Sequence, residues 1–320
     1  MADNSTAAWK VPLGPVPPPP PGLMKAKVPW MSTVRKGNLP YEELVLRKVR
    51  TIMNKLTVEK YYILRTQLID SGITTPSILQ GVTSLIFSKA VMEPTFCPLY
   101  AFLCSELSVY FPSFPPDEPQ GKQITFMRIL LDICQATYES ANMKAGETRQ
   151  QTMTVAPNQD LEYGYKERRQ NLGNIRFICE LSKQRRAVLT IVSLILKHLV
   201  EQDDVEVNVE AICLLLSTVG RQLDESSSKS RVTNDVYFDR LKDLLTIHPQ
   251  LATRLKFMIY DILDLRANNW VNPRHPNQVK DKAINELIRP LEVQKKLGRI
   301  RFAEGTTDWK KSIFTEISPR

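Results

Sequence analysis

Glycine is scarce in this chain of 320 residues, with only 12 present. Proteins built from many short strands need frequent turns, and glycine supplies many of them. The apolar stretches here are also longer than an ordinary strand, which favours helices. The composition therefore argues against a β-sandwich or barrel and predicts an all-α protein.

Motifs for the common kinds of catalysis are missing. No glycine-rich loop with a following lysine is present to surround a phosphate group. The three histidines, His198, His248 and His275, lie far apart, and none has a second ligand at metal-binding spacing on a helix. No local pattern marks a nucleophile. We therefore expect no enzyme: no catalytic residues, no metal ion and no cofactor.

The cysteines form no paired motif. Five are present, an odd number, and no two have C-x-x-C spacing. They are Cys97, Cys104, Cys134, Cys179 and Cys213. Their apolar surroundings predict reduced core residues of a cytoplasmic protein. The N-terminus lacks the apolar segment of a secretory signal, and the longest aliphatic stretch, VLTIVSLIL, is too short to span a bilayer, so no membrane partner is expected.

Positive charge is concentrated in three regions. The formal net charge is +9, and residues 1–60, 161–186 and 266–320 carry +6, +4 and +6, so the remaining residues are acidic overall. Such an uneven distribution indicates local contact with a polyanion such as RNA, or with an acidic protein face. Simple solvation of the surface by Lys and Arg is an equally open interpretation.

Residues 1–40 are predicted to be a proline-rich disordered arm. An unbroken run from Pro17 to Pro21 fixes φ and removes amide donors, which leaves polyproline II or coil. The run suits either a semi-rigid spacer or a ligand for an SH3 or WW domain.

Between residues 41 and 275 the apolar periodicity predicts helices in pairs. The expected pairs are 44–56 with 57–72, 75–93 with 96–111, 122–141 with a segment around 171–181, 188–200 with 203–220, and 233–248 with 249–266. About five antiparallel pairs are typical of a HEAT-type α-solenoid, and a compact helical bundle is the alternative. Residues 276–320 are expected to form a basic tail with one short helix.

Several local expectations accompany this assignment. Thr57 is expected to cap the second helix, Gly72 to close it, and Asp203 to cap the eighth. The polar stretch 142–159 is expected to be a long loop or a surface insertion.

The segment NLGNIRFICEL, residues 171–181, is expected to open a helix, with YKERRQ as a basic lead-in. A glycine inside a helix costs about 1 kcal/mol against alanine, so Gly173 indicates close approach by a neighbouring helix. Ile175, Ile178 and Leu181 are expected to face inward, and Asn171 or Asn174 to satisfy backbone groups.

Six stretches, in order, carry a family resemblance. They are KVRTIMNKLTVEKYYILRTQLIDSGITT, LIFSKAVMEPTFCPLYAFLCSEL, FPSFPPDEPQGKQITFMRILLDICQ, NLGNIRFICEL, EAICLLLSTVGRQLD and LKFMIYDILDLRANNWV. Together, over about residues 44–275, they resemble the middle domain of eukaryotic translation initiation factor 4 gamma in its plant-type form.

The resemblance implies a non-enzymatic five-repeat HEAT scaffold of the cytoplasmic cap-binding complex. Such a scaffold binds a DEAD-box RNA helicase, initiation factor 4A, together with mRNA and the multi-subunit factor that recruits the ribosome. No second helical domain follows before Arg320, so a short paralogue is expected, and the sequence leaves open whether it activates or represses translation. The alternative is a HEAT-type RNA-binding adaptor or repressor of another mRNA pathway, such as nonsense-mediated decay.

The resemblance and the charge pattern together nominate contact residues. Expected helicase contacts are Phe257, Arg254, Arg266, Trp270 and Trp9, with Trp30 competing for the role of Trp9 and a core position as the alternative for Phe257. Expected RNA contacts are Arg168, Arg169, Arg176, Lys295 and Lys296. Tyr41 and Leu46 match a cap-binding-protein ligand except that Arg47 follows them, and the favoured alternative places Leu44 and Leu46 in the first solenoid helix.

Overall fold

The computed structural model describes residues 40–116, 121–151, 160–202, 205–248 and 250–271. These residues form ten α-helices and, within those ranges, no β-strand beyond an isolated bridge between Phe114 and Ile124. The helices are α1 (Tyr41–Met53), α2 (Tyr61–Ile69), α3 (Pro76–Met92), α4 (Cys97–Tyr110), α5 (Phe126–Gln151), α6 (Asp160–Gln184), α7 (Arg186–Glu201), α8 (Val205–Ser226), α9 (Ser228–Ile247) and α10 (Thr253–Ala267).

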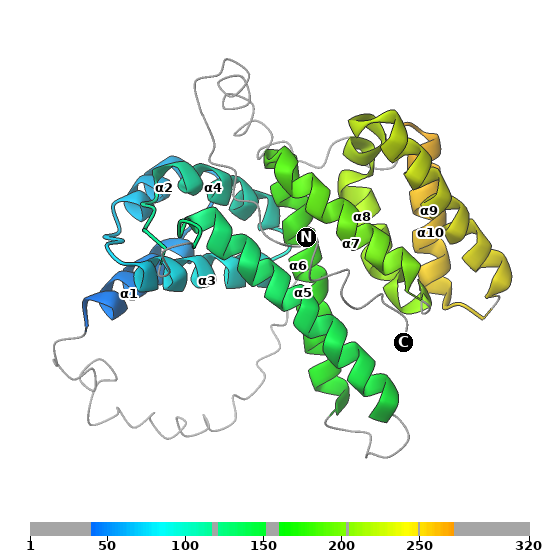
Figure 1. The fold of residues 1–320 in the computed structure, drawn as a ribbon, viewed down its shortest axis with the longest axis horizontal. Helices are drawn as coiled ribbons and strands as arrows, with labels where there is room; N and C mark the ends of the chain where they lie inside the picture. Colours follow the sequence, from blue (N-terminus) through cyan, green and yellow to red (C-terminus); the bar gives the residue numbers. More distant parts are fainter. Residues whose placement is uncertain (1–39, 117–120, 152–159, 203–204, 249, 272–320) are drawn as a thin grey trace, which may run out of the picture. The chain divides into compact units, whose positions relative to one another are not determined.

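Consecutive helices pack as pairs, from α1 with α2 to α9 with α10 (Figure 1). The even-numbered helices also contact one another in succession, so that α2, α4, α6, α8 and α10 form a continuous layer. On the other side, α1 contacts α3 and α3 contacts α5. Stacking of this kind is the arrangement of an α-solenoid, in which each pair covers the apolar face of the next. The predicted all-α, HEAT-like fold is confirmed.

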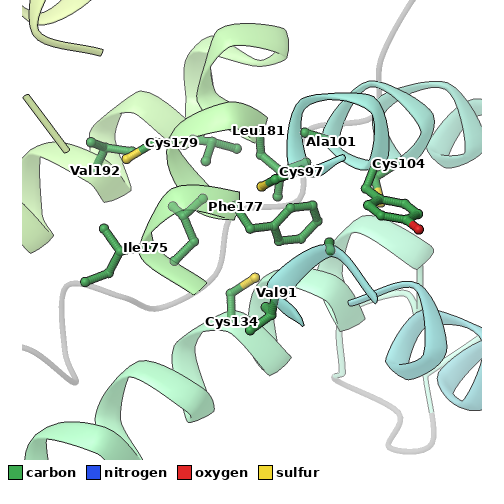
Figure 2. Packing of buried hydrophobic residues seen from close by; sticks show 14 of the residues in the cluster. Val91, Cys97, Ala101, Cys104, Cys134, Ile175, Phe177, Cys179, Leu181 and Val192 are labelled. Carbon is green, nitrogen blue, oxygen red and sulfur yellow. The ribbon is translucent and has the colours of Figure 1, made fainter. Parts of the chain in front are cut away.

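Side chains from five helices meet around α6 in the core. Figure 2 shows Phe177 of α6 among residues of α3 and α4, with Cys134 of α5 and Val192 of α7 nearby. Phe177 is fully buried, and its ring contacts that of Phe87 at a centroid distance of 6.1 Å. All five cysteines are buried and unbridged.

Two predicted helix starts can be compared with the structure. Thr75 caps α3 by accepting a hydrogen bond from the backbone N–H of Ile78, and Pro76 occupies the first turn. The expected cap at Thr57 is wrong, because α2 begins only at Tyr61, after a turn, and its N-cap position is Lys60. Gly72 follows α2 with a φ of +98°, a left-handed conformation that favours glycine. The expected cap at Asp203 lies outside the described residues.

The predicted loop from residue 142 is wrong over its first part, because α5 continues to Gln151. The stretch NMKAGETRQQ has no apolar stripe, yet it is rich in residues of good helix propensity, and a polar helix of this kind escapes a search for apolar periodicity. Likewise α6 begins at Asp160, so NLGNIRFICEL lies in the interior of a helix and YKERRQ is helical.

The expected roles of the interior residues of α6 are confirmed. Ile175, Ile178 and Leu181 are fully buried. Asn174 is also buried, and its side-chain amide donates a hydrogen bond of 2.8 Å to the backbone carbonyl of Cys134 in α5. Gly173 lies directly against the backbone of Val91 at the end of α3.

Candidate nucleic-acid and partner-binding sites

A basic pocket lies where α6, α8 and α10 meet. It has a volume of about 340 Å³. Its lining consists of Arg168, Arg169, Leu172, Gly173 and Arg176 from α6, Glu210 from α8, Arg254 from α10, and Pro94. The α6 residues recur every three or four positions, which places them on one face of the helix.

Glu210 joins two of the arginines. Its two carboxylate oxygens accept hydrogen bonds from Arg168 at 2.9 Å and from Arg254 at 2.5 Å. The Glu210 side chain is only 17% exposed, whereas those of Arg168 and Arg254 are 50% and 67% exposed. The hydrogen bond from Arg254 and the charges of both guanidinium groups outweigh the effect of burial and lower the pKa of Glu210. The carboxylate is therefore ionised at neutral pH.

This pocket unites residues that the sequence assigned to different partners. Arg168, Arg169 and Arg176 were expected to contact RNA, and Arg254 was expected to contact the helicase. The structure places all four in the lining of one pocket, and two of them, Arg168 and Arg254, bind its carboxylate.

The outer face of α10 presents two aromatic side chains. Phe257 is 63% exposed and Tyr260 is 50% exposed, while Ile259 and Ile262 on the opposite face are buried. The alternative that Phe257 is a core residue is therefore wrong. Spacing of three residues places Phe257 and Tyr260 one turn apart on the same face of α10.

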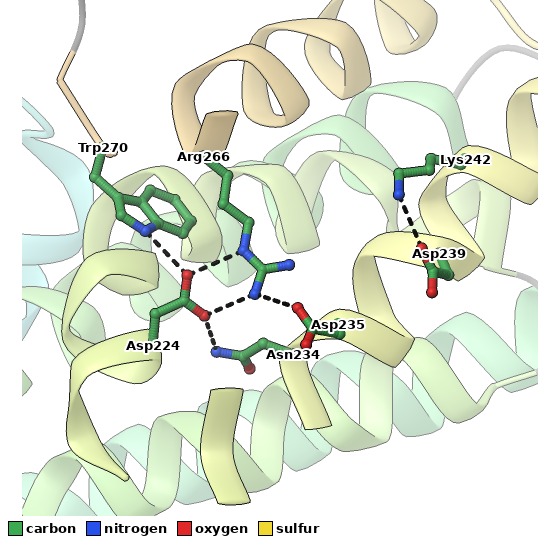
Figure 3. A network of polar contacts seen from close by, with 7 residues as sticks. All are labelled: Asp224, Asn234, Asp235, Asp239, Lys242, Arg266 and Trp270. Atoms are coloured by element: carbon green, nitrogen blue, oxygen red, sulfur yellow. Dashed lines mark hydrogen bonds and ion pairs between the residues drawn. The ribbon is translucent and has the colours of Figure 1, made fainter. Parts of the chain in front are cut away.

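Arg266 and Trp270 have internal partners (Figure 3). Arg266 donates hydrogen bonds to Asp224 at 3.0 and 3.1 Å and to Asp235 at 2.7 Å, and its guanidinium lies 4.2 Å from the ring centroid of Phe238. Burial alone would lower the pKa of Arg266, but these carboxylates raise it. The indole N–H of Trp270 donates to the same Asp224 at 3.0 Å. Arg266 in α10 and Trp270, three residues after α10 ends, thus connect this part of the chain to α8 and α9.

The candidate cap-binding-protein contacts lie in α1. The Tyr41 hydroxyl donates to the Gly72 carbonyl at 2.9 Å, although the side chain remains largely exposed. Leu46 is partly buried and packs against the core beside Gly81. This placement agrees with the interpretation of Leu46 as part of the first solenoid helix. Trp9, Trp30, Lys295 and Lys296 lie outside the described residues.

Two residues of these sites were missed by the sequence analysis. Tyr260 carried a usable signal, because it follows Phe257 at the spacing of one helical turn on the polar side of the α10 stripe. Glu210 carried none, because its partners are 42 and 44 residues away in the sequence.

No metal site is apparent in the part of the chain that the structure describes, where no three His, Cys, Asp or Glu side chains gather closely enough to hold an ion. Among the described helices, none combines the length and apolar character needed to cross a membrane.

Comparison with known proteins accounts for the stacked helix pairs. Residues 46–269, nearly the whole described solenoid, match the MIF4G domain family. The chain belongs to the MIF4G domain family. The resemblance predicted from the six sequence stretches is thereby confirmed.

Relatives of this MIF4G protein include eukaryotic translation initiation factor 4G of Triticum aestivum, with 35% identity over 79% of the chain and 18% of the relative. The factor 4G of Arabidopsis thaliana is 36% identical over 72% of the chain and 13% of the relative. Eukaryotic translation initiation factor 4 gamma 1 of Mus musculus is 33% identical over 78% of the chain and 16% of the relative. The chain thus spans less than a fifth of the length of these relatives. A solved MIF4G domain, of Trypanosoma cruzi translation initiation factor EIF4G5, is 20% identical, with a TM-score of 0.41 over 71% of this chain and 97% of that one.

Proposed function

We propose that this chain is a non-enzymatic scaffold of translation initiation in the cytoplasm. In this proposal it holds a DEAD-box RNA helicase, initiation factor 4A, and mRNA within the cap-binding complex. Support comes from membership of the MIF4G domain family and from relatives that are named translation initiation factors. Contact with the ribosome-recruiting multi-subunit factor, and with the cap-binding protein through Tyr41, belongs to the same proposal.

The observation that carries the helicase part is the exposed aromatic pair Phe257 and Tyr260. A partner that covers two large aromatic side chains on one helical turn removes their apolar surface from water, which favours binding. Aromatic residues often dominate interface energetics. The hydrogen bonds that Arg266 and Trp270 donate to residues of α8 and α9 hold α10 against these helices. The pair is therefore presented on a supported helix, which limits the conformational entropy that binding removes.

A binding titration with purified initiation factor 4A tests this assignment. Replacing a central interface aromatic with alanine usually costs about 2 kcal/mol or more, so Phe257→Ala should weaken helicase binding by about thirtyfold. Val236→Ala on α9 is the matched control, since it removes an exposed apolar side chain of similar exposure from a different helix. Helical circular dichroism should be unchanged in both variants. Equal binding by the Phe257 variant and the wild-type chain would refute the assignment.

The same titration separates the alternative function. An RNA-binding adaptor of another mRNA pathway would bind RNA in a salt-sensitive way and show no affinity for initiation factor 4A.

A further inference from the structure

The pocket between α6, α8 and α10 carries more positive charge than its one carboxylate neutralises. Four arginines and Glu210 give its lining a net charge of +3. Arg168 and Arg254 share Glu210, whereas Arg169 and Arg176 make no ion pair or hydrogen bond with any described side chain. Only two of the four pocket arginines therefore have an ion pair within the described part of the structure that explains their presence in the pocket.

The paired arginines also retain free donors. Each guanidinium carries five N–H groups in a planar fork, and Arg168 and Arg254 each commit only their Nη2 atom to Glu210. Their side chains are half or more exposed, so the remaining N–H groups are accessible from solvent. Glu210 thus holds guanidinium groups from two different helices at one place without saturating them.

We propose that this pocket binds a backbone phosphate of single-stranded RNA and that Arg254 is one of its ligands, together with Arg168, Arg169 and Arg176. The proposal rests on the mRNA-binding part of the proposed function and moves Arg254 from the helicase surface to the RNA site. Guanidinium forks match the oxygens of a phosphate in a bidentate manner. Leu172 and Pro94 supply an apolar part of the lining against which a ribose can pack.

An RNA strand is the favoured ligand because exposed cations extend along α6 past the edge of the pocket. Lys166, which lies outside the pocket lining, is exposed next to Arg168 and Arg169, which belong to it. A row of cations spaced along a helix suits a row of phosphates, whereas a single acidic side chain would use the pocket alone.

Glu210 has a definite role in this site. It gathers Arg168 and Arg254 but competes with an incoming phosphate for the same N–H groups. Removal of its charge should therefore strengthen phosphate binding, while removal of any pocket arginine should weaken it. A purely structural ion-pair cluster would show neither effect on RNA affinity.

Fluorescence anisotropy of a labelled oligouridylate, titrated with the full chain at several KCl concentrations, tests the proposal. The variants are Arg254→Gln, Arg169→Gln and Glu210→Gln. The Arg169 side chain is exposed and makes no hydrogen bond or ion pair with a described side chain, so its variant is expected to fold and remains informative if another variant unfolds. Arg47→Gln and Glu43→Gln are matched controls, because these residues form an exposed ion pair on α1 with the same charges.

Each arginine variant should bind the RNA about threefold to tenfold more weakly, and the slope of log K against log salt should fall by about 0.7, the value for one lost single-strand phosphate contact. Glu210→Gln should bind about twofold to fivefold more tightly, from the loss of a competing charge. The two α1 controls should match the wild-type chain.

Three outcomes overturn the proposal. The first is that Arg254→Gln and Arg169→Gln bind RNA as tightly as Arg47→Gln, and the second is that Glu210→Gln binds RNA more weakly than the wild-type chain. The third is that Arg254→Gln loses helicase binding while its RNA affinity is unchanged. If the arginine substitutions weakened the binding of polyglutamate but left RNA binding unchanged, the pocket would be assigned to an acidic peptide instead. If the wild-type chain binds no RNA at all, the mRNA part of the proposed function fails with it. A wild-type chain that binds RNA independently of these residues refutes only the pocket.

Discussion

The carbonyl oxygen of Val91 occupies the space in which any residue other than glycine at position 173 would carry its Cβ atom. An ideal Cβ on Gly173 would lie 2.4 Å from that oxygen and 2.9 Å from a methyl carbon of Val91. Real Cβ atoms do not approach a backbone oxygen so closely. The backbones of α6 and α3 can therefore pack this close together only because residue 173 has no side chain. This contact explains a glycine in the interior of α6.

Gly173→Ala should lower the free energy of unfolding by about 2 kcal/mol. The obstructing atom belongs to the backbone and cannot rotate away, so the overpacking cost lies at the upper end of the usual range, about 3 kcal/mol, and the gain in helix propensity offsets about 1 kcal/mol of it. Gly81→Ala in α3 is the control, because the nearest atoms to its Cβ all belong to the Leu46 side chain, the closest being a methyl carbon at 2.8 Å. That flexible side chain can move, so the control should change stability by less than about 1 kcal/mol. Urea unfolding of both variants tests the difference, and equal losses would contradict it.

Asp224→Asn should destabilise the last helix pair by about 2–4 kcal/mol. Asp224 accepts hydrogen bonds from Arg266, Trp270 and Asn234, and its side chain is only 12% exposed, so the substitution leaves a partly buried guanidinium without its main counter-charge. Asp239→Asn removes the same charge from an exposed pair with Lys242, which should cost less than about 1 kcal/mol. Figure 3 shows both ion pairs. Similar melting temperatures for the two variants would count against the structural role of Asp224.

All five cysteine thiols should be unreactive in the folded chain. Burial raises the pKa of each, and for Cys213 it does so from 9.0 to about 12, aided by nearby carboxylates. The thiolate is the reactive form, and with a pKa of about 12 only about one Cys213 thiol in ten thousand is ionised near pH 8. Labelling with a thiol-specific disulfide reagent should be slow without denaturant and fast in urea. A cysteine that reacts at the free-thiol rate in the native protein would show that its helix opens.

The fold could be predicted from the sequence to the extent that apolar side chains recur along the helices. A helix was predicted over 249–266, and α10 runs from Thr253 to Ala267, with Ile259 and Ile262 buried while Asp261 and Asp264 are exposed. The polar end of α5 was missed, because helix propensity without an apolar face leaves no periodic pattern.

The candidate sites were harder to predict, because they depend on contacts between distant residues. Arg168 and Arg254 are 86 positions apart in the sequence and meet only through Glu210, which no local pattern singled out. The internal role of Trp270 was equally hidden. Its indole lies against Gly220, and its backbone has a φ of +63°, neither of which follows from the residues around it.

The most direct test of the scaffold proposal is the ATPase rate of initiation factor 4A, measured with RNA present and with increasing amounts of this chain. The account predicts that the wild-type chain and Val236→Ala raise the helicase rate to the same plateau, that Phe257→Ala needs a much higher concentration to do so, and that the chain alone hydrolyses no ATP. A helicase rate that does not respond to the wild-type chain, or ATP turnover by the purified chain without the helicase, would contradict it.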